Sequence, residues 1–86
     1  MAEITVFGAD WCADTRHTRQ HLADLGLDYR YVNIEEDPEA EDWVREQNDG
    51  AEKLPTLNVG GLVLSIPSDA ELDVALRRQG FVPRDV

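Results

Sequence analysis

The sequence predicts a small α/β layered domain in which a four-stranded mixed sheet carries helices on both faces. Strand-like and helix-like segments alternate in the order β-α-β-α-β-β-α, and neither a linker nor a repeat interrupts them. A Gly-Gly pair between two apolar runs indicates a tight hairpin. The 86 residues leave room for a single domain, residues 1–86, with one modest core.

The first three elements form a predicted βαβ unit. An apolar strand covers residues 4–7, a helix follows over about residues 13–25 and stops at Gly26, and a second strand covers residues 29–34. A right-handed crossover makes the two strands parallel. The helix then starts at the carboxyl edge of the sheet, where open α/β sheets bind ligands.

The second helix is predicted from its capping residues. Asp37-Pro38 supplies an N-cap and a proline suited to the first helical position, and Asn48-Asp49-Gly50 ends the helix. Its apolar face comprises Ala40, Trp43, Val44 and Gln47.

A hairpin and a third helix complete the predicted fold. Strands over residues 56–59 and 62–64 flank Gly60-Gly61, whose glycines tolerate the positive φ of a tight turn, so the strands should pair antiparallel. Residues 68–71 have capping-box spacing at the start of the last helix, and Gly80 stops it.

Charge and hydropathy exclude several classes of partner. The net charge is −10 with only eight Lys and Arg residues, which argues against nucleic acid and anionic membrane surfaces. No apolar run approaches the roughly 20 residues of a membrane span. The acidic residues are concentrated in residues 35–46, which contain seven carboxylates and one basic residue, Arg45. This segment is interpreted as a solvated helix face.

The chain opens directly on a strand-like segment, so we expect no signal peptide and, by default, a reducing, cytoplasmic compartment. A single cysteine cannot form an internal disulfide, so we expect that disulfides do not hold this fold together. We also expect a monomer.

Cys12 is the candidate nucleophile because it stands between a strand end and a helix start. Backbone N–H groups and the dipole of a helix N-terminus stabilise a thiolate, which is the reactive form of the side chain. The alternative is that Cys12 is a small buried apolar side chain, as free cysteines often are.

The neighbours of Cys12 have opposite expected effects on its ionisation. Thr15 and Arg16 lie one helical turn on and can approach the sulfur with a hydroxyl and a positive charge, which favour the thiolate. Asp10 and Asp14 bring like charge close and disfavour it. Thr15 could instead fill space against the sheet, with its hydroxyl bonded to the carbonyl one turn back.

Two histidines and a second arginine on the same helix are interpreted as solvated. His17 and His21 are one turn apart, but zinc needs three or four ligands and no third is evident, so we predict no metal site. Arg16, His17 and Arg19 could equally form a plain solvated helix face.

Five segments in order resemble the glutaredoxins, and most closely the short bacterial glutaredoxin-like proteins called mycoredoxins. They are Trp11-Cys12-x-x, Tyr31-Val32-Asn33-Ile34-Glu35, Asn48-x-Gly50, Leu54-Pro55-Thr56 and Pro67-Ser68-x-Ala70-Glu71. The resemblance runs from about residue 4 to residue 76 and implies a thioredoxin-like fold.

The resemblance implies thiol–disulfide exchange with Cys12 as nucleophile. Thr15 stands where the family's second cysteine would be, so the implied cycle is monothiol. Cys12 would take a small thiol from a modified protein, and a second molecule of mycothiol or glutathione would release it. The implied partners are this small thiol, as co-substrate, and thiol-modified proteins, with no tightly bound cofactor.

The resemblance also implies a thiol-binding surface that includes Trp11. In thioredoxin-fold proteins the proline that matches Pro55 is cis and lies beside the nucleophile, and the backbone of the residue before it, here Leu54, pairs with an extended substrate. Lys53 at the same edge can meet a carboxylate, or it can be a solvated surface lysine.

Ser68 and Asp69 match a polar pair that holds the small thiol in many glutaredoxins, although the usual Gly-Gly before that pair is absent. Free N–H groups at this helix start can also bind an anion. Alternatively, Ser68 is a plain N-cap and Asp69 favours the helix dipole. Pro67-Ser68 resembles the mycoredoxin version, which favours mycothiol over glutathione.

A binding module with the same fold and an inert Cys12 is the rival interpretation. The missing second cysteine and the two aspartates near Cys12 favour it. Glutaredoxins that bind iron–sulfur clusters carry Cys-Gly-Phe-Ser, whereas Ala13-Asp14-Thr15 would place a carboxylate near an anionic cluster.

Overall fold

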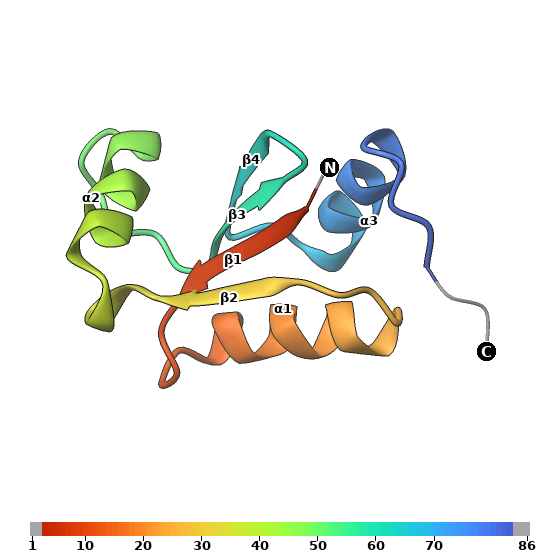
Figure 1. Ribbon diagram of the computed structural model, residues 1–86, viewed down its shortest axis with the longest axis horizontal. Coiled ribbons are helices and arrows are strands. Elements are labelled where there is room, and N and C mark those ends of the chain that lie inside the picture. Colours follow the sequence, from red (N-terminus) through yellow and green to blue (C-terminus); the bar gives the residue numbers. More distant parts are fainter. Residues whose placement is uncertain (1–2, 84–86) are drawn as a thin grey trace.

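The computed structural model describes residues 3–83 and confirms the predicted order of elements (Figure 1). The strands and helices are β1 (Ile4–Gly8), α1 (Ala13–Asp24), β2 (Arg30–Asn33), α2 (Pro38–Gln47), β3 (Thr56–Val59), β4 (Leu62–Ser65) and α3 (Asp69–Arg78). A 3₁₀ turn at Ile34–Glu36 joins β2 to α2. β2 is thus shorter than predicted, because the Asn33 side chain accepts a hydrogen bond from the Glu35 N–H and starts this turn.

The four strands form one mixed sheet in the order β2-β1-β3-β4. β1 pairs parallel with β2, whereas β1 with β3 and β3 with β4 pair antiparallel. Both the predicted parallel βαβ unit and the predicted antiparallel hairpin are therefore confirmed. At the hairpin turn Gly60 and Gly61 adopt φ of 58° and 101°, a region that side chains with a Cβ rarely enter.

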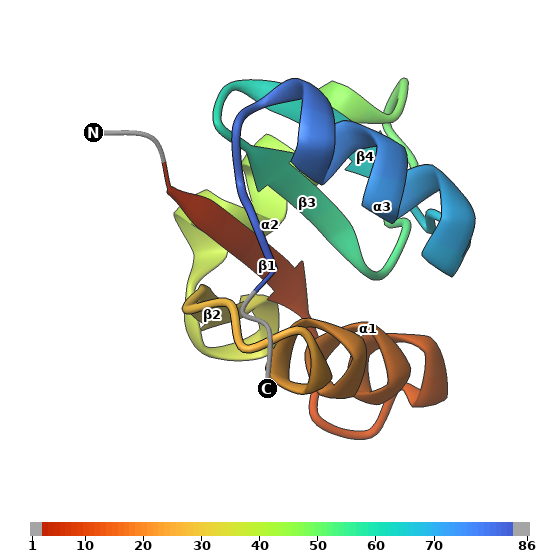
Figure 2. The same ribbon diagram turned by 90° about the vertical axis from the view of Figure 1, so that its right-hand side faces the viewer.

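Helices α1 and α3 cover one face of the sheet and α2 covers the other (Figure 2). Alternate side chains of a strand point to opposite faces, so the sheet has two apolar clusters. The cluster under α1 and α3 contains Ile4, Val6, Leu22, Leu57, Val59, Leu72 and Leu76. The cluster under α2 contains Ala9, Ile34, Ala40, Val44 and Leu54, with Phe7, Cys12, Val32 and Trp43 packed against it.

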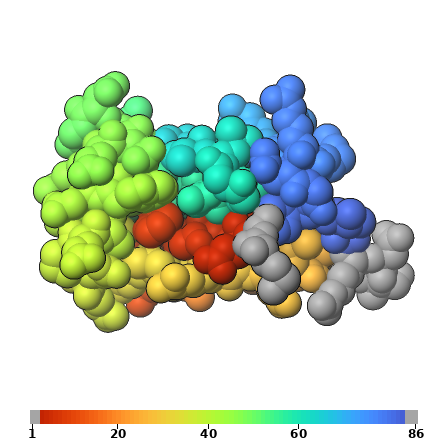
Figure 3. Space-filling view, turned by 45° about the horizontal axis from the view of Figure 1, so that its top comes forward, coloured from red at the N-terminus to blue at the C-terminus, as the bar shows by residue number. Residues whose placement is uncertain are grey.

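In the space-filling view, α2 (green) and the β3–β4 hairpin (cyan) border the part of β1 (red) that reaches the surface (Figure 3).

The N-caps follow the predictions. Asp37 accepts a hydrogen bond from the Ala40 N–H at 3.1 Å, and Ser68 and Glu71 form a reciprocal capping box. Within residues 3–83, none of the helices has the length and apolar content that a membrane span needs.

Gly8, the last residue of β1, packs closely against Thr15 of α1. A Cβ at this position would lie 2.4 Å from Thr15 Cγ2 and 2.5 Å from Thr15 Oγ1. Thr15 is fully buried, so its short side chain cannot move aside without disturbing the helix. We expect Gly8→Ala to lower the free energy of unfolding by about 1–3 kcal/mol, as overpacking does in a well-packed core. Urea unfolding would measure this change.

A double variant separates this clash from a general effect on the strand. Thr15→Ala removes the two nearest of the three Thr15 atoms that the new methyl group would meet, and leaves only Cβ, at 3.0 Å. Gly8→Ala should therefore cost much less in a Thr15→Ala background than in the native chain. An equal cost in both backgrounds would contradict the proposed packing.

Candidate functional site

Cys12 lies at the N-cap position of α1, in a turn that follows the carboxyl end of β1. Its backbone is extended (φ −78°, ψ 120°), and its N–H donates to the Ala9 carbonyl at 3.0 Å. The side chain is half-buried against the cluster under α2 and makes no capping hydrogen bond. The sulfur lies 3.9 Å from the Leu54 carbonyl oxygen, to which the thiol can donate weakly.

The structure thus brings Cys12 together with the Leu54-Pro55 segment, 42 residues away in the chain. The Leu54-Pro55 peptide bond is cis. The Leu54 side chain is buried under α2, which leaves its backbone as the part that faces the sulfur. The Pro55 carbonyl accepts a hydrogen bond of 2.8 Å from the Ile66 N–H. Lys53 precedes this pair with an exposed side chain.

A buried polar network fixes the Lys53–Pro55 segment. Asn48 Nδ2 donates to the Val44 carbonyl (2.7 Å) and to Thr56 Oγ1 (3.2 Å), and Thr56 Oγ1 donates to the Lys53 carbonyl (2.7 Å). Ser65 Oγ donates to Asn48 Oδ1. The sequence placed Asn48 at a helix end and in the glutaredoxin-like segment Asn48-x-Gly50, but it indicated no contact for its side chain. A buried side chain between α2, β3 and β4 has no signature in local sequence.

Thr15 faces the sheet, at the point where Gly8 leaves space for it. Its side chain is fully buried, which agrees with the alternative that Thr15 fills space against the sheet. The expected hydrogen bond to the carbonyl one turn back is wrong, because Thr15 Oγ1 has no partner among the described residues.

Arg16 and Asp10 fasten the turn that carries Cys12. The Arg16 guanidinium donates to the Asp10 backbone carbonyl at 3.1 Å. The Asp10 carboxylate accepts a hydrogen bond of 2.7 Å from the Tyr31 hydroxyl on β2. The guanidinium of Arg19 lies over the Tyr31 ring, 3.8 Å from its centroid, and donates to the Tyr29 hydroxyl at 3.2 Å. Arg19 therefore contacts two tyrosines. The prediction that Arg19 belongs to a solvated helix face is wrong.

Burial, and then the hydrogen bond to Asp10, raise the pKa of Tyr31 from 10.0 to about 12. Since the fold favours the neutral phenol, its contribution to stability is fully present below pH 10.0 and is lost as the pH rises through about 12. We expect a tyrosinate absorbance transition near pH 12 that Tyr31→Phe removes. Tyr29→Phe is the matched control and should retain it. Loss of this transition in Tyr29→Phe would contradict the assignment to Tyr31.

Ser68 and Asp69 begin α3, and both side chains already have partners. Ser68 Oγ accepts the Glu71 N–H at 3.1 Å, and the Ser68 N–H donates to the Glu71 carboxylate at 2.9 Å. The Asp69 carboxylate lies 3.0 Å from His17 Nε2 on α1. A ligand at this helix start would share Asp69 with a histidine.

Both histidines pair with carboxylates of α3. The expected solvated position is confirmed for His17, whose side chain is 66 % exposed, and is wrong for His21, whose side chain is 19 % exposed. Besides the His17–Asp69 pair, His21 Nε2 lies 2.7 Å from the Asp73 carboxylate. These contacts join α1 to α3, and the sequence could not reveal them because the partners are 52 residues apart. Within residues 3–83, no group of three or more potential ligands is arranged to hold a metal ion.

The surface beside Cys12 includes two exposed apolar side chains. Trp11 precedes the cysteine and is 64 % exposed, whereas Ile66 lies in the loop bonded to Pro55 and is 46 % exposed. Ile66 has a φ of 46°, which is unusual for a β-branched residue.

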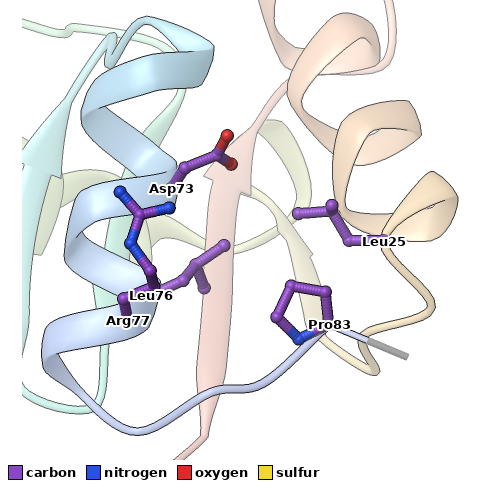
Figure 4. A pocket seen from close by; sticks show the side chains of 5 residues that line it. All are labelled: Leu25, Asp73, Leu76, Arg77 and Pro83. Carbon is purple, nitrogen blue, oxygen red and sulfur yellow. The ribbon is translucent and has the colours of Figure 1, made fainter. Parts of the chain in front are cut away.

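A cavity of about 250 Å³ lies between α1 and α3, away from Cys12 (Figure 4). Leu25, Asp73, Leu76, Arg77 and Pro83 line it. Because Leu25 follows the last residue of α1 and Cys12 precedes its first, the cavity and the sulfur lie at opposite ends of this helix. The cavity therefore does not belong to the Cys12 site.

Comparison with known proteins identifies the relatives of this chain. A family model described as glutaredoxin matches residues 4–64. Mycoredoxin 1 of Corynebacterium glutamicum is 33 % identical over 57 residues, which cover 66 % of this chain and 70 % of that protein. Two solved structures have the same fold. The glutaredoxin-like protein NrdH-redoxin from Escherichia coli has a TM-score of 0.73 at 27 % identity, covering 87 % of this chain and 92 % of the other. A glutaredoxin from Archaeoglobus fulgidus has a TM-score of 0.72 at 20 % identity, covering 90 % and 88 %.

Proposed function

The chain belongs to the glutaredoxin family of thiol–disulfide oxidoreductases, and we propose that it is a monothiol member that reduces mixed disulfides between proteins and a low-molecular-weight thiol. The observation that carries this proposal is the approach of the only cysteine to Leu54, with its sulfur 3.9 Å from the carbonyl oxygen of that residue. A nucleophilic sulfur and an extended segment that can pair with a substrate backbone then share one edge of the sheet.

The proposed cycle uses one protein sulfur and two small-thiol molecules. The Cys12 thiolate attacks the small-thiol sulfur of the mixed disulfide, whose S–S bond breaks, and the substrate protein leaves as a thiolate that takes up a proton. A second small thiol, as its thiolate, then attacks the adduct at the same small-thiol sulfur. This step releases Cys12 as a thiolate and the small-thiol disulfide as product. Overall, one mixed disulfide and one free small thiol become one protein thiol and one small-thiol disulfide, so the S–S bond passes from the substrate protein to the pair of small thiols.

The chain's own residues position these steps. The Leu54 N–H and C=O are the groups that would pair with the substrate backbone, and Pro55 keeps this segment beside Cys12. Arg16 adds a positive charge at the turn before α1, and the free N–H groups of α1 favour negative charge at its start. Thr15 takes the position of a second sulfur and offers the substrate no resolving thiol.

The small thiol would lie against Trp11, Lys53 and the start of α3, where Ser68 and Asp69 are. Trp11 supplies an exposed apolar face beside the sulfur, and Lys53 can meet a carboxylate. The similarity to Mycoredoxin 1 favours mycothiol, and glutathione is the other candidate.

Intact-mass spectrometry with two small-thiol disulfides tests this proposal. The reduced chain is mixed with mycothiol disulfide or with glutathione disulfide, and we expect one small-thiol adduct per chain, located at Cys12. Reduction of a mixed-disulfide peptide should then become faster as more of the matching small thiol is added. Absence of an adduct with either thiol, or a rate independent of small thiol, would contradict the monothiol cycle.

A thioredoxin-fold binding module without turnover is the second candidate. Two observations favour it: the Cys12 side chain makes no capping hydrogen bond, and its thiol donates to a carbonyl, a contact available only to the neutral form. In this case the edge formed by Leu54 would bind an extended peptide. Peptide binding that persists in Cys12→Ala, together with an unreactive thiol, would favour this module.

A further inference from the structure

The Asp10 carboxylate is attached to the edge of the sheet by Tyr31. Asp10 stands two residues before Cys12, in the same turn, and is the acidic residue whose effect on the thiolate the sequence left open. Its carboxylate accepts a hydrogen bond of 2.7 Å from the Tyr31 hydroxyl, and Arg16 holds its carbonyl. This turn is thereby joined both to β2 and to α1.

Tyr31 and Cys12 belong to opposite faces of the sheet. Tyr31 packs against the cluster under α1 and α3, whereas Cys12 packs against the cluster under α2. Tyr31 is on β2, at one side of β1, and the Cys12 sulfur faces Leu54, just before β3 at the other side. The partner of the Asp10 carboxylate is therefore on the β2 side of β1, whereas the partner of the sulfur is on the β3 side.

We propose that Tyr31 is a positioning residue for the reaction of Cys12, because it holds the negative charge of Asp10 away from the sulfur that must become a thiolate. Two unit charges of like sign repel each other even in a partly solvated site, and this repulsion would slow a reaction that needs the thiolate. The inference rests on the proposed function only in taking Cys12 as the reacting group.

Arg19 supports this arrangement from the other side of the ring. Its guanidinium lies 3.8 Å from the centroid of the Tyr31 ring and also bonds Tyr29. The ring is thus fixed between α1 and β2, with its hydroxyl directed at Asp10. Asp14 is the other carboxylate near Cys12, and it lies exposed in the first turn of α1.

Cys12 alkylation by iodoacetamide at neutral pH and low salt tests the proposal. Tyr31→Phe retains the ring and its packing but loses the hydroxyl, so the Asp10 carboxylate is released. We expect the alkylation rate to fall about threefold, which corresponds to a modest screened repulsion. Added salt should restore much of the rate. Tyr29→Phe is the matched control, since it removes a tyrosine hydroxyl that contacts Arg19 and not Asp10, and its alkylation rate should fall much less than that of Tyr31→Phe.

A double variant separates charge from structure. In an Asp10→Asn background there is no charge to release, so Tyr31→Phe should leave the alkylation rate unchanged. An equal fall in both backgrounds, or no fall in either, would overturn the proposal. Alkylation needs neither a disulfide nor a small thiol, so its outcome is independent of the mixed-disulfide experiment. Failure to form a small-thiol adduct would contradict the proposed function and leave the role of Tyr31 in thiol reactivity to be judged by alkylation alone.

Discussion

Cys12→Ser should abolish reduction of mixed disulfides and formation of the small-thiol adduct. The chain has no other cysteine, and a serine hydroxyl is not deprotonated near neutral pH without a strong base beside it. We expect the rate of peptide reduction, followed by chromatography, to fall to the level without protein, at least about 100-fold. A substantial residual rate would contradict the role of Cys12.

The same substitution should not weaken the fold, which separates loss of chemistry from loss of structure. Cys12 occupies an N-cap position without a capping hydrogen bond, and serine is a preferred N-cap residue. Cys12→Ser is therefore expected to raise the free energy of unfolding by about 0.5–1 kcal/mol relative to Cys12→Ala, which lacks a capping oxygen. Both variants should be inactive. Equal stabilities would argue that residue 12 does not cap α1.

Asn48→Ala should be the most destabilising of the proposed single substitutions. Asn48 is 8 % exposed and bonds Val44, Thr56 and Ser65 through its side chain. Its removal takes away the buried donor to the Val44 carbonyl and to Thr56 Oγ1, at a position where water does not easily replace it. Thr56 keeps its bond to Lys53, and Ser65 is exposed. We expect the free energy of unfolding to fall by about 2–4 kcal/mol, measured by urea unfolding.

Asn58→Ala is the matched control for this substitution. Asn58 Oδ1 also accepts a hydrogen bond, from the Gly61 N–H at 2.7 Å, but this contact is exposed at the hairpin turn. We expect its loss to cost less than about 1 kcal/mol. Similar losses for the two variants would mean that the buried network does not have the stabilising role assigned to it.

Asn48 stabilises the fold and also positions part of the candidate site. Through Thr56 it fixes the Lys53 carbonyl, directly before the Leu54 backbone that faces the sulfur. A folded Asn48→Ala chain should therefore show a higher apparent KM for a mixed-disulfide peptide, with Cys12 alkylation by a small reagent little changed. A normal KM in this variant would argue against a positioning role.

Local signals predicted the elements and two of their caps. Asp37 and Ser68 cap the helices that their spacing indicated, because a cap depends on residues three apart in sequence. The boundaries of β2 were less accurate, since the Asn33 side chain ends this strand through a turn that a strand-like pattern does not reveal. Cys12 was placed correctly at a helix start, because strand, turn and helix follow one another directly.

Side-chain partners from different elements were missed or wrong. His21 was expected in solvent, but its side chain is only 19 % exposed and bonds Asp73. His17 is exposed as expected, but its bond to Asp69 was missed. Nothing in the sequence indicated that the Tyr31 hydroxyl donates a hydrogen bond to Asp10. Each of these pairs depends on how two elements pack, which periodicity along one element does not encode.

The sequence by itself determined the order of strands and helices, the position of Cys12 and the presence of a single sulfur. These features follow from local propensity, capping and composition, which act over a few residues. Only the tertiary structure decided that the sulfur faces Leu54, that Thr15 fills the space beside Gly8 and that Asp10 is bonded to Tyr31. The physical reason is that packing of the helices on the two faces of the sheet, and the pairing of β1 with β2 and β3, bring together groups far apart in the chain.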